Sequence, residues 1–438
     1  MLIEFSVKNF KSIRDEQTLS LVASNYYNES KEVLIDTKIP GLAKASYLPC
    51  AVVFGANASG KSSLIHALAV LKDMVLTAFN KAPGTSLAYL PFALDSNFWN
   101  AATELNISFT VEGVRYEYMI SYTAQYVLEE SLAAFPKGKG QLWFHRSYDT
   151  AKNETICKPI TRYLKVPSDI VEVLRDDVPF ISMLIMLNYD SIKPLAKWFS
   201  EDLAIVDRGS DVPQDSLQQY SRNLLKGTAG TSKMRAVLMN MIKMADFGIL
   251  DAQVVPAPAP EIPFPEEVIN MMPEEFLAGI NDAEWETIQF THQSNDAPQH
   301  FSYDAESAGT RRLFELAGPI ADVLDSGKTL VIDELDTSMH PLLVNEILRL
   351  FQSQITNTSG AQLICTVHST STMERGLLRR DQIWFTKKRR EGNTELYPLS
   401  DYKPRKDESV EASYLSGRYD AIPVIHELFG YRWGAADQ

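Results

Sequence analysis

The residues with the clearest chemical use are eight consecutive positions with the P-loop pattern, in which four residues separate two glycines and Lys-Ser follows: Gly55-Ala56-Asn57-Ala58-Ser59-Gly60-Lys61-Ser62. Glycines let backbone N–H groups turn inward around phosphate oxygens, and a following helix adds about half a positive charge. The pattern predicts that Lys61 reaches the β- and γ-phosphates of ATP and that the Ser62 hydroxyl holds Mg²⁺. The predicted nucleotide-binding residues here are Gly55, Asn57, Ser59, Gly60, Lys61, Ser62 and Ser63.

A P-loop needs a strand before it and a helix after it, and the sequence provides both. The run 51–54 is apolar and predicts a buried strand. Leu64, Leu68, Leu71 and Val75 recur at steps of four, three and four, which places them on one helix face. This context argues against a chance match in a flexible loop.

A second motif consists of two acids, Asp333-Glu334, directly after the apolar run 329–332. This run predicts another buried strand, which ends at the two acids. Beside a P-loop, Asp333 is expected to bind the Mg²⁺ water shell. Glu334 is expected to act as the general base that orients water on the γ-phosphate. Acids often cap strands, so this strand end alone is a weak signal.

Three further features have structural alternatives when each is taken alone. The stretch 306–310 could be an ordinary helix N-cap, and His368, at the end of the apolar run 361–367, could be a structural histidine. Asp336 lies in the loop after Glu334. Because these features follow the P-loop in a fixed order, four independent coincidences would be needed to make them all structural.

Composition places the chain among globular proteins of about two to three domains, since 45% of its 438 residues are hydrophobic and 22% are charged. No apolar run approaches the roughly 20 residues that span a bilayer, and the first residues lack a signal-peptide pattern. Three distant cysteines fit a reducing compartment and no metal-ligand spacing. We expect a cytoplasmic protein without a membrane partner.

The net charge of −14 is concentrated in one segment, because residues 244–310 contain thirteen acids and no Lys or Arg. Such a segment repels phosphates and disfavours nucleic acid as its partner. It predicts docking of a basic partner or trigger, and the alternative is a solvated surface loop. If the segment docks a partner, charge reversal at five of its acids should reduce pull-down of that partner, and undiminished pull-down would rule docking out. The five acids are Glu261, Glu266, Glu267, Glu274 and Glu275.

The predicted fold class is α/β, with a P-loop ATPase head built from a mixed sheet plus an antiparallel lobe and carrying a helical insertion. Residues 1–135 and 284–438 form the two parts of the head, and 136–283 form the insertion with a proline-rich acidic excursion. Within these parts we expect antiparallel strands at 105–111 and 114–120 and helices over 166–244. Strands are expected to return at 286–290 and 299–303, and Pro319 is expected to kink or shift the helix that ends near 324.

With these motifs in this order, the chain resembles ABC-type ATPase heads of the structural-maintenance-of-chromosomes (SMC) and overcoming-lysogenization-defect class. Within that class it is most similar to bacterial anti-phage ATPases of the RloA and AbiL type and to AriA, the ATPase subunit of PARIS systems. The resemblance covers about 1–135 and 284–425. The residues that carry it are Phe10-Lys11-Ser12-Ile13, the P-loop, Ser307-Ala308-Gly309, the strand 330–332 with Asp333-Glu334, Asp336, His368 and the run 414–423.

The resemblance implies roles for residues outside the P-loop. Lys11 and Ser12 would lie near adenine or the α-phosphate, and His368 would sense the γ-phosphate. Ser307 and Gly309 would contact the γ-phosphate of ATP held by a second subunit. Asp336 would communicate across that interface. A homodimer or a higher multiple, with ATP between its heads, is therefore implied.

The sequence differs from the class in two places, the Q-loop and the length of chain after Glu334. Pro91-Phe92 occupies the place where a Q-loop glutamine is expected. Only 104 residues follow Glu334, too few for a C-terminal Toprim nuclease, so we expect any nuclease to be a separate chain.

The favoured function is an ATP-hydrolysing subunit of a bacterial anti-phage system, which senses infection through a phage trigger and controls a separate toxin or nuclease effector. The alternative is a DNA-repair or DNA-scanning ATPase, and a third possibility is a scaffold that binds ATP and barely hydrolyses it. The DNA alternative needs a basic groove, for which the candidates are Arg375, Arg379, Arg380, Lys387, Lys388, Arg389, Arg390, Lys403, Arg405 and Lys406. The run 387–390 is also predicted as the turn of a hairpin, and the alternative to DNA binding is that this basic run is a solvated hairpin tip.

Overall fold

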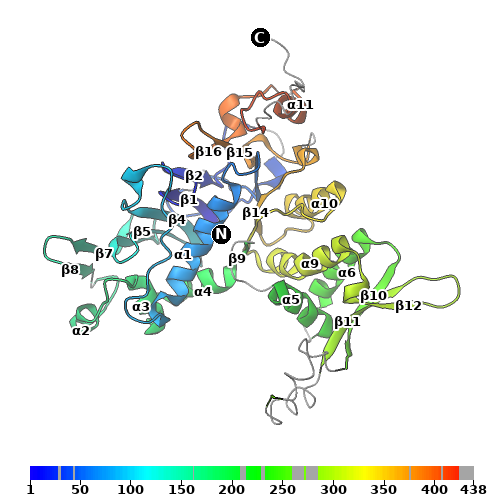
Figure 1. Ribbon diagram of the computed structural model, residues 1–438, viewed down its shortest axis with the longest axis horizontal. Coiled ribbons are helices and arrows are strands. Elements are labelled where there is room, and N and C mark those ends of the chain that lie inside the picture. The colour runs from blue at the N-terminus through cyan, green and yellow to red at the C-terminus, as the bar shows by residue number, and fades with distance from the viewer. Residues whose placement is uncertain are drawn as a thin grey trace. The chain divides into compact units, whose positions relative to one another are not determined.

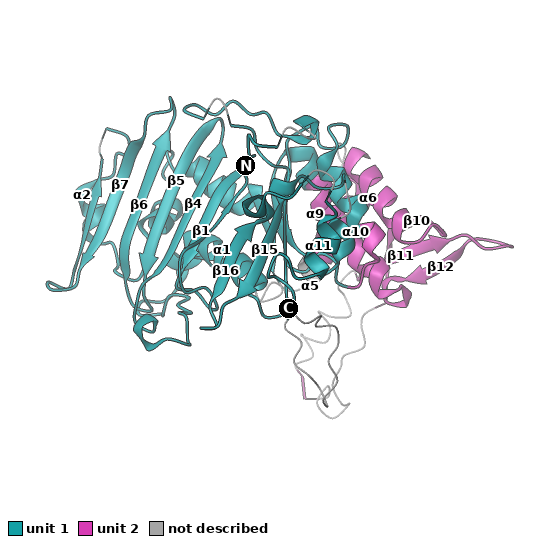
Figure 2. Ribbon diagram, turned by 90° about the horizontal axis from the view of Figure 1, so that it is seen from above, with its two compact units in different colours: residues 1–212, 323–337, 344–438 teal, residues 213–322, 338–343 magenta. Residues whose placement is uncertain are grey.

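The computed structural model describes residues 1–27, 31–42, 45–160, 162–207, 214–227, 232–258, 271–272, 285–373, 376–405 and 408–423. They form two compact units (Figure 2). The first contains residues 1–212, 323–337 and 344–438, and the second contains residues 213–322 and 338–343. Most acids of the predicted docking segment, together with Arg375 and Lys406, lie outside the described residues.

One sheet of the first unit is antiparallel and has seven strands, in the order β2-β1-β4-β5-β6-β7-β8 (Figure 1). The two antiparallel strands predicted at 105–111 and 114–120 are present as β4 and β5. The turn between them consists of Glu112 and Gly113, both with positive φ. Two-residue turns of this kind match the twist of the strands they join. The last two strands fall within the range 136–283 that was expected to be a helical insertion. The strands are β1 (Leu2–Lys8), β2 (Gln17–Ser20), β4 (Thr103–Val111), β5 (Val114–Tyr122), β6 (Val127–Phe135), β7 (Gln141–Asp149) and β8 (Glu154–Pro159).

The other sheet of the first unit is mixed and has six strands, in the order β16-β15-β3-β14-β13-β9. Five of these strands run parallel and only β16 is antiparallel, so the carboxyl ends of the five meet at one edge. The predicted α/β class, with a mixed sheet and an antiparallel lobe, is confirmed. The strands are β3 (Cys50–Gly55), β9 (Leu203–Val206), β13 (Thr329–Ile332), β14 (Gln362–Thr366), β15 (Ile383–Lys388) and β16 (Thr394–Pro398).

The helical prediction for 166–244 was wrong at β9, which pairs in parallel with β13. This strand is only four residues long, and its neighbours in sequence are helix formers. Its strand conformation therefore depends on the partner strand and not on a local pattern. Helices occupy much of the remaining stretch: α2 (Ser168–Glu172), α3 (Phe180–Met186), α4 (Lys193–Lys197), a π-helical turn Trp198–Asp202, α5 (Gln214–Lys226) and α6 (Ser232–Ala245).

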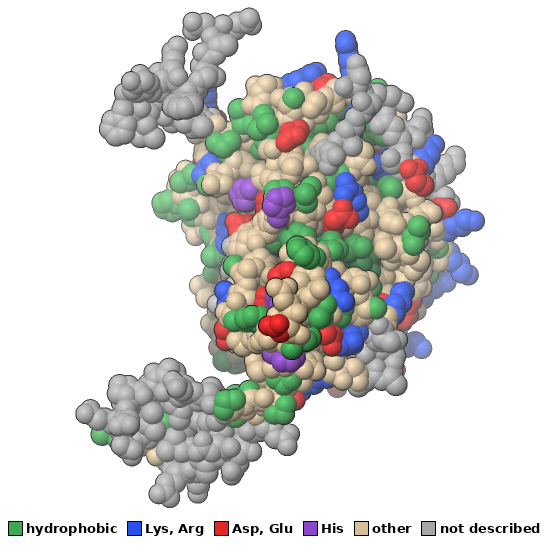
Figure 3. Space-filling model, turned by 90° about the vertical axis from the view of Figure 1, so that its right-hand side faces the viewer, with side chains coloured by type: hydrophobic (Ala, Val, Ile, Leu, Met, Phe, Trp, Pro, Cys, Tyr) green, Lys and Arg blue, Asp and Glu red, His purple; other side chains and the backbone are tan. Residues whose placement is uncertain are grey.

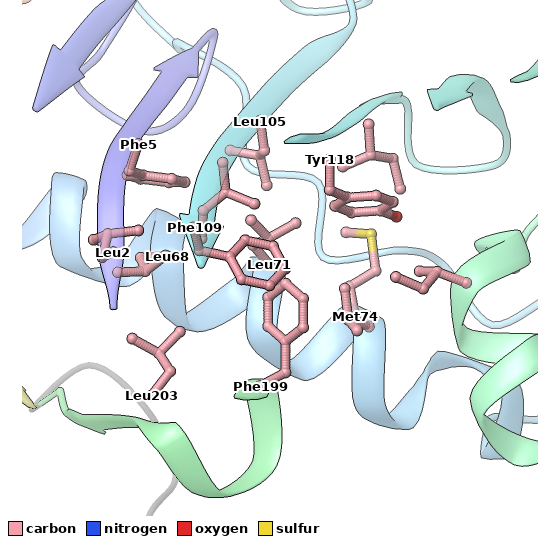
Figure 4. Close-up of a cluster of buried hydrophobic side chains, with 14 of the residues drawn as sticks. Leu2, Phe5, Leu68, Leu71, Met74, Leu105, Phe109, Tyr118, Phe199 and Leu203 are labelled. Carbon is pink, nitrogen blue, oxygen red and sulfur yellow. The ribbon is translucent and has the colours of Figure 1, made fainter. Parts of the chain in front are cut away.

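The helix after the P-loop, α1 (Lys61–Thr77), packs its apolar face against the antiparallel sheet. Figure 4 shows Leu68, Leu71 and Met74 directed toward side chains of β1, β4 and β5, including Phe109. Each such buried side chain contributes about 1.5–3 kcal/mol. The segment Lys61–Asn80 is long and apolar enough to cross a membrane by length and composition alone, and its buried residues explain that apolar character.

The second unit contains the three-stranded antiparallel sheet β10 (Ile249–Pro256), β11 (Glu286–His292) and β12 (Gln299–Ser302), as well as α5, α6 and most of α9 (Ala308–Ser326). Both predicted returning strands are present. Pro256 is the last residue of β10. The proline-rich excursion predicted from the sequence therefore begins only after this strand.

The helix α9 continues through Pro319, where a kink or shift was expected. Proline cannot donate to the carbonyl four residues earlier, which leaves helix carbonyls without their usual donor. The Ser221 hydroxyl of α5 donates to Phe314 O at 2.6 Å and accepts from Gly318 N at 3.0 Å. The same hydroxyl lies 3.5 Å from Glu315 O, the carbonyl that Pro319 leaves without its usual donor, so Ser221 bridges polar groups of the turn before the proline.

Two further helices, α10 and α11, lie wholly or mostly in the first unit. The helix α10 (Pro341–Gln352) follows the Asp333-Glu334 strand and buries Val344, Ile347 and Leu348. The helix α11 (Val410–Leu415) places Tyr414 against Phe385 of β15, with ring centroids 5.5 Å apart. This aromatic packing covers the end of the mixed sheet near β15.

Candidate nucleotide-binding site

A pocket of about 490 Å³ lies at the carboxyl edge of the mixed sheet, within the first unit. In open α/β sheets this edge is where ligands bind, because loops from several strands converge there. Ten of the twelve lining residues belong to the predicted site. The lining residues are Lys11, Ser12, Asn57, Ala58, Ser59, Gly60, Lys61, Ser62, Ser63, Glu334, His368 and Lys388.

The P-loop has the backbone shape that its glycines permit. Gly60 has φ of 106°, and a Cβ placed there would lie 2.0 Å from Thr394 Oγ1. Ala58 also has positive φ, at 60°. The Ser59 hydroxyl lies 2.6 Å from Thr386 Oγ1, so a hydrogen bond joins the P-loop to β15. Only glycine fits at position 60 without strain and without displacing β16.

Lys61 supplies a buried positive charge to the pocket. Its ammonium donates to Gly55 O at 2.7 Å and to Ala56 O at 3.1 Å, and the residue is 6% exposed. Burial lowers the pKa of Lys61 below its ordinary value, and the charges of Asp333, Glu334 and Asp336 oppose this shift. Within the described part of the chain no carboxylate forms an ion pair with Lys61. An anion in the pocket would therefore compensate its buried charge, which fits the phosphates of a nucleotide.

Thr366, at the end of β14, orients both acids that follow β13. Its hydroxyl donates to Asp333 Oδ1 at 2.6 Å and accepts from Glu334 N at 2.7 Å. Glu334 has φ of 52°, so its backbone leaves the strand direction at this residue. Asp333 is 2% exposed. With the Ser62 hydroxyl in the pocket lining, Asp333 and Ser62 are the oxygen donors that could hold Mg²⁺ beside a triphosphate.

His368 and Glu334 form the opposite side of the pocket, with His368 Nε2 and Glu334 Oε1 3.7 Å apart. Asp336 holds the histidine loop, because its Oδ2 accepts from His368 N at 2.8 Å and from Ser369 N at 2.7 Å. The structure thus places Glu334 and His368 in the pocket and Asp336 behind the histidine. A proton acceptor and a neighbouring imidazole can together hold a water molecule next to bound phosphate.

The loop with Lys11 and Ser12 forms a further part of the pocket lining. Lys11 has φ of 49° and donates its backbone N–H to Leu90 O at 2.6 Å. The Ser12 hydroxyl lies 2.9 Å from Ser63 Oγ, which joins this loop to the first turn of α1. Phe92, in the expected Q-loop position, is buried and donates its backbone N–H to the Asn9 side chain.

The signature-like residues belong to the second unit. Ser307 caps α9, because its hydroxyl accepts from Thr310 N at 3.1 Å. A Cβ at Gly309 would lie 2.9 Å from Ser338 O, so the helix start approaches that loop closely. Ser307 is exposed, and its hydroxyl also lies 2.9 Å from Thr310 Oγ1.

Ser307→Ala should lower the free energy of unfolding of the second unit by about 1 kcal/mol, because an N-cap hydrogen bond is lost. Urea unfolding measured by circular dichroism tests this. The matched control is Ser302→Ala, since Ser302 begins a short helical turn without a side-chain cap. Equal stability of the Ser307 and Ser302 variants would contradict the capping role.

The family comparison agrees with this pocket. A family model matches residues 50–154 and 199–374, which is more than half of the chain and includes the P-loop, Asp333, Glu334 and His368. The family, AAA_21, has a description that names an AAA domain, the AbiEii toxin and a type IV TA (toxin–antitoxin) system. The chain belongs to the AAA_21 family. As an AAA_21 protein it has a P-loop ATPase domain.

The AAA_21 chain is also similar to solved SMC heads. One is the SMC head domain from Thermotoga maritima, with 13% identity, a TM-score of 0.39, and coverage of 91% of this chain and 98% of that chain. Another is the Smc head domain with an extended coiled coil from Pyrococcus furiosus, bound to the C-terminal domain of ScpA, with 12% identity, a TM-score of 0.44, and coverage of 92% and 97%. Similarity at this level says nothing about function. A search of curated proteins found no match.

Two kinds of residue in the AAA_21 site escaped the sequence analysis. Thr366, Thr386 and Thr394 are strand residues whose hydroxyls hold the acids and the P-loop. Threonine is common in strands, so the sequence carries no signal for them. Lys388 lines the pocket, although its place in a basic run suggested a solvated hairpin or a DNA-binding surface.

Proposed function

We propose that this chain is the ATP-binding and ATP-hydrolysing subunit of a bacterial anti-phage defence system, which senses infection and controls a separate toxin or nuclease effector. The observation that carries the enzymatic part is the pocket that unites Lys61, Glu334 and His368. The family description, with its type IV TA system, supports the link to a toxin.

The proposed hydrolysis assigns a task to each group in the pocket. The P-loop N–H groups and Lys61 bind the phosphates, and Asp333 and Ser62 bind Mg²⁺. Bound Mg²⁺ supplies charge neutralisation on the phosphate oxygens. Glu334 accepts the proton of the attacking water, and His368 holds that water or the γ-phosphate from the other side. Asp336 positions His368 through the two backbone hydrogen bonds described above.

A homodimer, or a higher multiple, is part of the proposal. The exposed Ser307 at the start of α9 supports it, since a helix N-terminus favours an anion such as the γ-phosphate held by a second copy. Closed two-fold assemblies are also the commonest form of homo-oligomer. ATP would then lie between two subunits, and hydrolysis would release them or the effector.

The cellular test is a phage challenge of bacteria carrying this gene together with its genetic neighbours. We expect that the intact chain lowers phage plating efficiency and that Lys61→Ala abolishes this protection, because nucleotide binding is lost. Co-purification of a tagged chain identifies the effector. Equal protection by the intact chain and by the Lys61 variant would refute an ATP-controlled defence function.

The DNA-scanning alternative receives less support from the contacts of its basic candidates. Lys387 pairs with Glu395 at 3.3 Å, and Arg389 pairs with the same carboxylate at 2.6 Å. Arg379 is buried against Asp381 at 2.8 Å. On the face shown in Figure 3, acidic side chains lie among basic ones. A DNA affinity that falls steeply with salt, together with DNA-stimulated hydrolysis, would reverse this preference.

A further inference from the structure

The pocket contains a third lysine that belongs to none of the recognised motifs. Lys388 is the last residue of β15, the strand beside β3, and it lines the pocket together with Lys11 and Lys61. It lies 327 residues after Lys61 in the sequence. Its position follows from the parallel pairing of β15 with β3, which brings the carboxyl ends of both strands to the same edge.

The basic run that contains Lys388 is divided by the alternation of side chains along a strand. Lys387 and Arg389 lie on one side and share the carboxylate of Glu395. Lys388 points to the other side, because successive side chains of a strand face opposite directions. No carboxylate in the part of the chain that the structure describes forms an ion pair with Lys388.

The hairpin β15–β16 is fastened to the nucleotide-binding loops by hydroxyl groups. Thr394 Oγ1 donates to Ser59 O at 2.9 Å and lies 2.8 Å from Ser12 Oγ. Thr386 holds Ser59 from the neighbouring strand. The turn end of the hairpin, where Lys388 pairs with Thr394, is therefore fixed relative to the P-loop.

The lysine stem also has a defined neighbour in the turn. Gly392 has φ of 82°, and a Cβ built there would lie 3.8 Å from Lys388 Cε and 2.3 Å from Leu94 Cδ1. A side chain at position 392 would therefore collide with Leu94 and lie beside the Lys388 stem, and glycine leaves this space open. In the pocket lining, a flexible lysine can act as a point charge for a phosphate oxygen.

We propose that Lys388 binds the phosphate chain of the nucleotide, so that the hairpin β15–β16 is part of the binding site and not a DNA-binding tip. This inference rests on the proposed function, because it needs a nucleotide in the pocket. Lys388 donates from its ammonium to a non-bridging phosphate oxygen, on the side of the pocket formed by β15. Lys61 donates from the P-loop side. The two lysines together neutralise more phosphate charge than the P-loop alone.

The test is a calorimetric titration of the full-length protein with a non-hydrolysable ATP analogue and, separately, with adenosine. Lys388→Ala should raise the Kd for the analogue about 10-fold or more, the scale of one charge-assisted hydrogen bond. Its Kd for adenosine should equal that of the unaltered chain, and Lys388→Arg should recover most of the lost affinity. The matched control is Arg390→Ala, which removes a charge from the same turn outside the pocket and should leave both constants unchanged.

Three results would overturn the inference. They are unchanged affinity of Lys388→Ala for the analogue, an equal loss of affinity for adenosine, and an equal loss in the Arg390 variant. Urea unfolding of each free protein shows whether a variant is folded, and Lys388→Gln replaces Lys388→Ala if the latter is not. Failure of the unaltered chain to bind the analogue would instead refute the proposed function, so the two failures are distinguishable.

Discussion

Glu334→Gln is expected to reduce the rate of ATP hydrolysis about 100-fold or more, while the affinity for ATP stays close to that of the unaltered chain. A positioned general base contributes on this scale, and glutamine keeps the shape of glutamate but accepts no proton. The backbone of Glu334 is fixed through its hydrogen bond to Thr366, so the substituted side chain should keep its place. Phosphate release measures hydrolysis, and calorimetry measures binding.

The control for this variant is Glu346→Gln, which removes a carboxylate from the surface of α10, where Glu346 pairs with Arg349. Its hydrolysis rate should match that of the unaltered chain. If Glu334→Gln hydrolyses ATP as fast as the control, Glu334 is not the base. If the unaltered chain binds ATP but both proteins hydrolyse it negligibly, the chain is a nucleotide-gated scaffold. A stable ATP-bound dimer that forms with the Glu334 variant, and not with the control, would support the proposed assembly in which ATP lies between two subunits.

Gly60→Ala is expected to abolish ATP binding and to lower the free energy of unfolding of the first unit by about 2–5 kcal/mol. Two costs add. An alanine at positive φ costs about 1–2 kcal/mol, and crowding a packed site costs about 1–3 kcal/mol. Here the new methyl group would meet Thr394 Oγ1, so β16 or the P-loop must move. Urea unfolding and calorimetric titration measure the two effects.

Gly84 provides the matched control, because it also has positive φ, at 79°, but a Cβ there would meet no atom within 4 Å. Gly84→Ala should therefore show only the backbone cost of about 1–2 kcal/mol and should bind ATP normally. Equal destabilisation by both substitutions would show that the close approach of Thr394 to Gly60 has no energetic consequence. Normal ATP binding by Gly60→Ala would contradict the assigned role of the loop.

The parts of the site that the sequence predicted are those encoded by local patterns. The strand before the P-loop is an unbroken apolar run, and Gly55 to Ser62 follow it at fixed spacing. The strand before Asp333 has the same character. Such strands are buried on both faces, so their apolar runs are visible without a structure.

The remaining parts depend on contacts between distant segments. The strand β9 is defined by its pairing with β13, and the α9 helix tolerates Pro319 beside a hydroxyl of α5. Lys388 reaches the pocket because β15 pairs with β3 in parallel. Long-range pairing of this kind leaves no local periodicity, so the sequence suggested a solvated hairpin for Lys388 and a helix for β9.

The single hydroxyl of Thr366 has a consequence for signalling. It touches the side chain of Asp333 and the backbone of Glu334, and it belongs to the strand that leads into His368. Any displacement of this strand would therefore shift Asp333, Glu334 and His368 together, and with them the metal binding, water activation and phosphate detection proposed for these residues. Such an arrangement would couple the three proposed steps, so that they are gained or lost together.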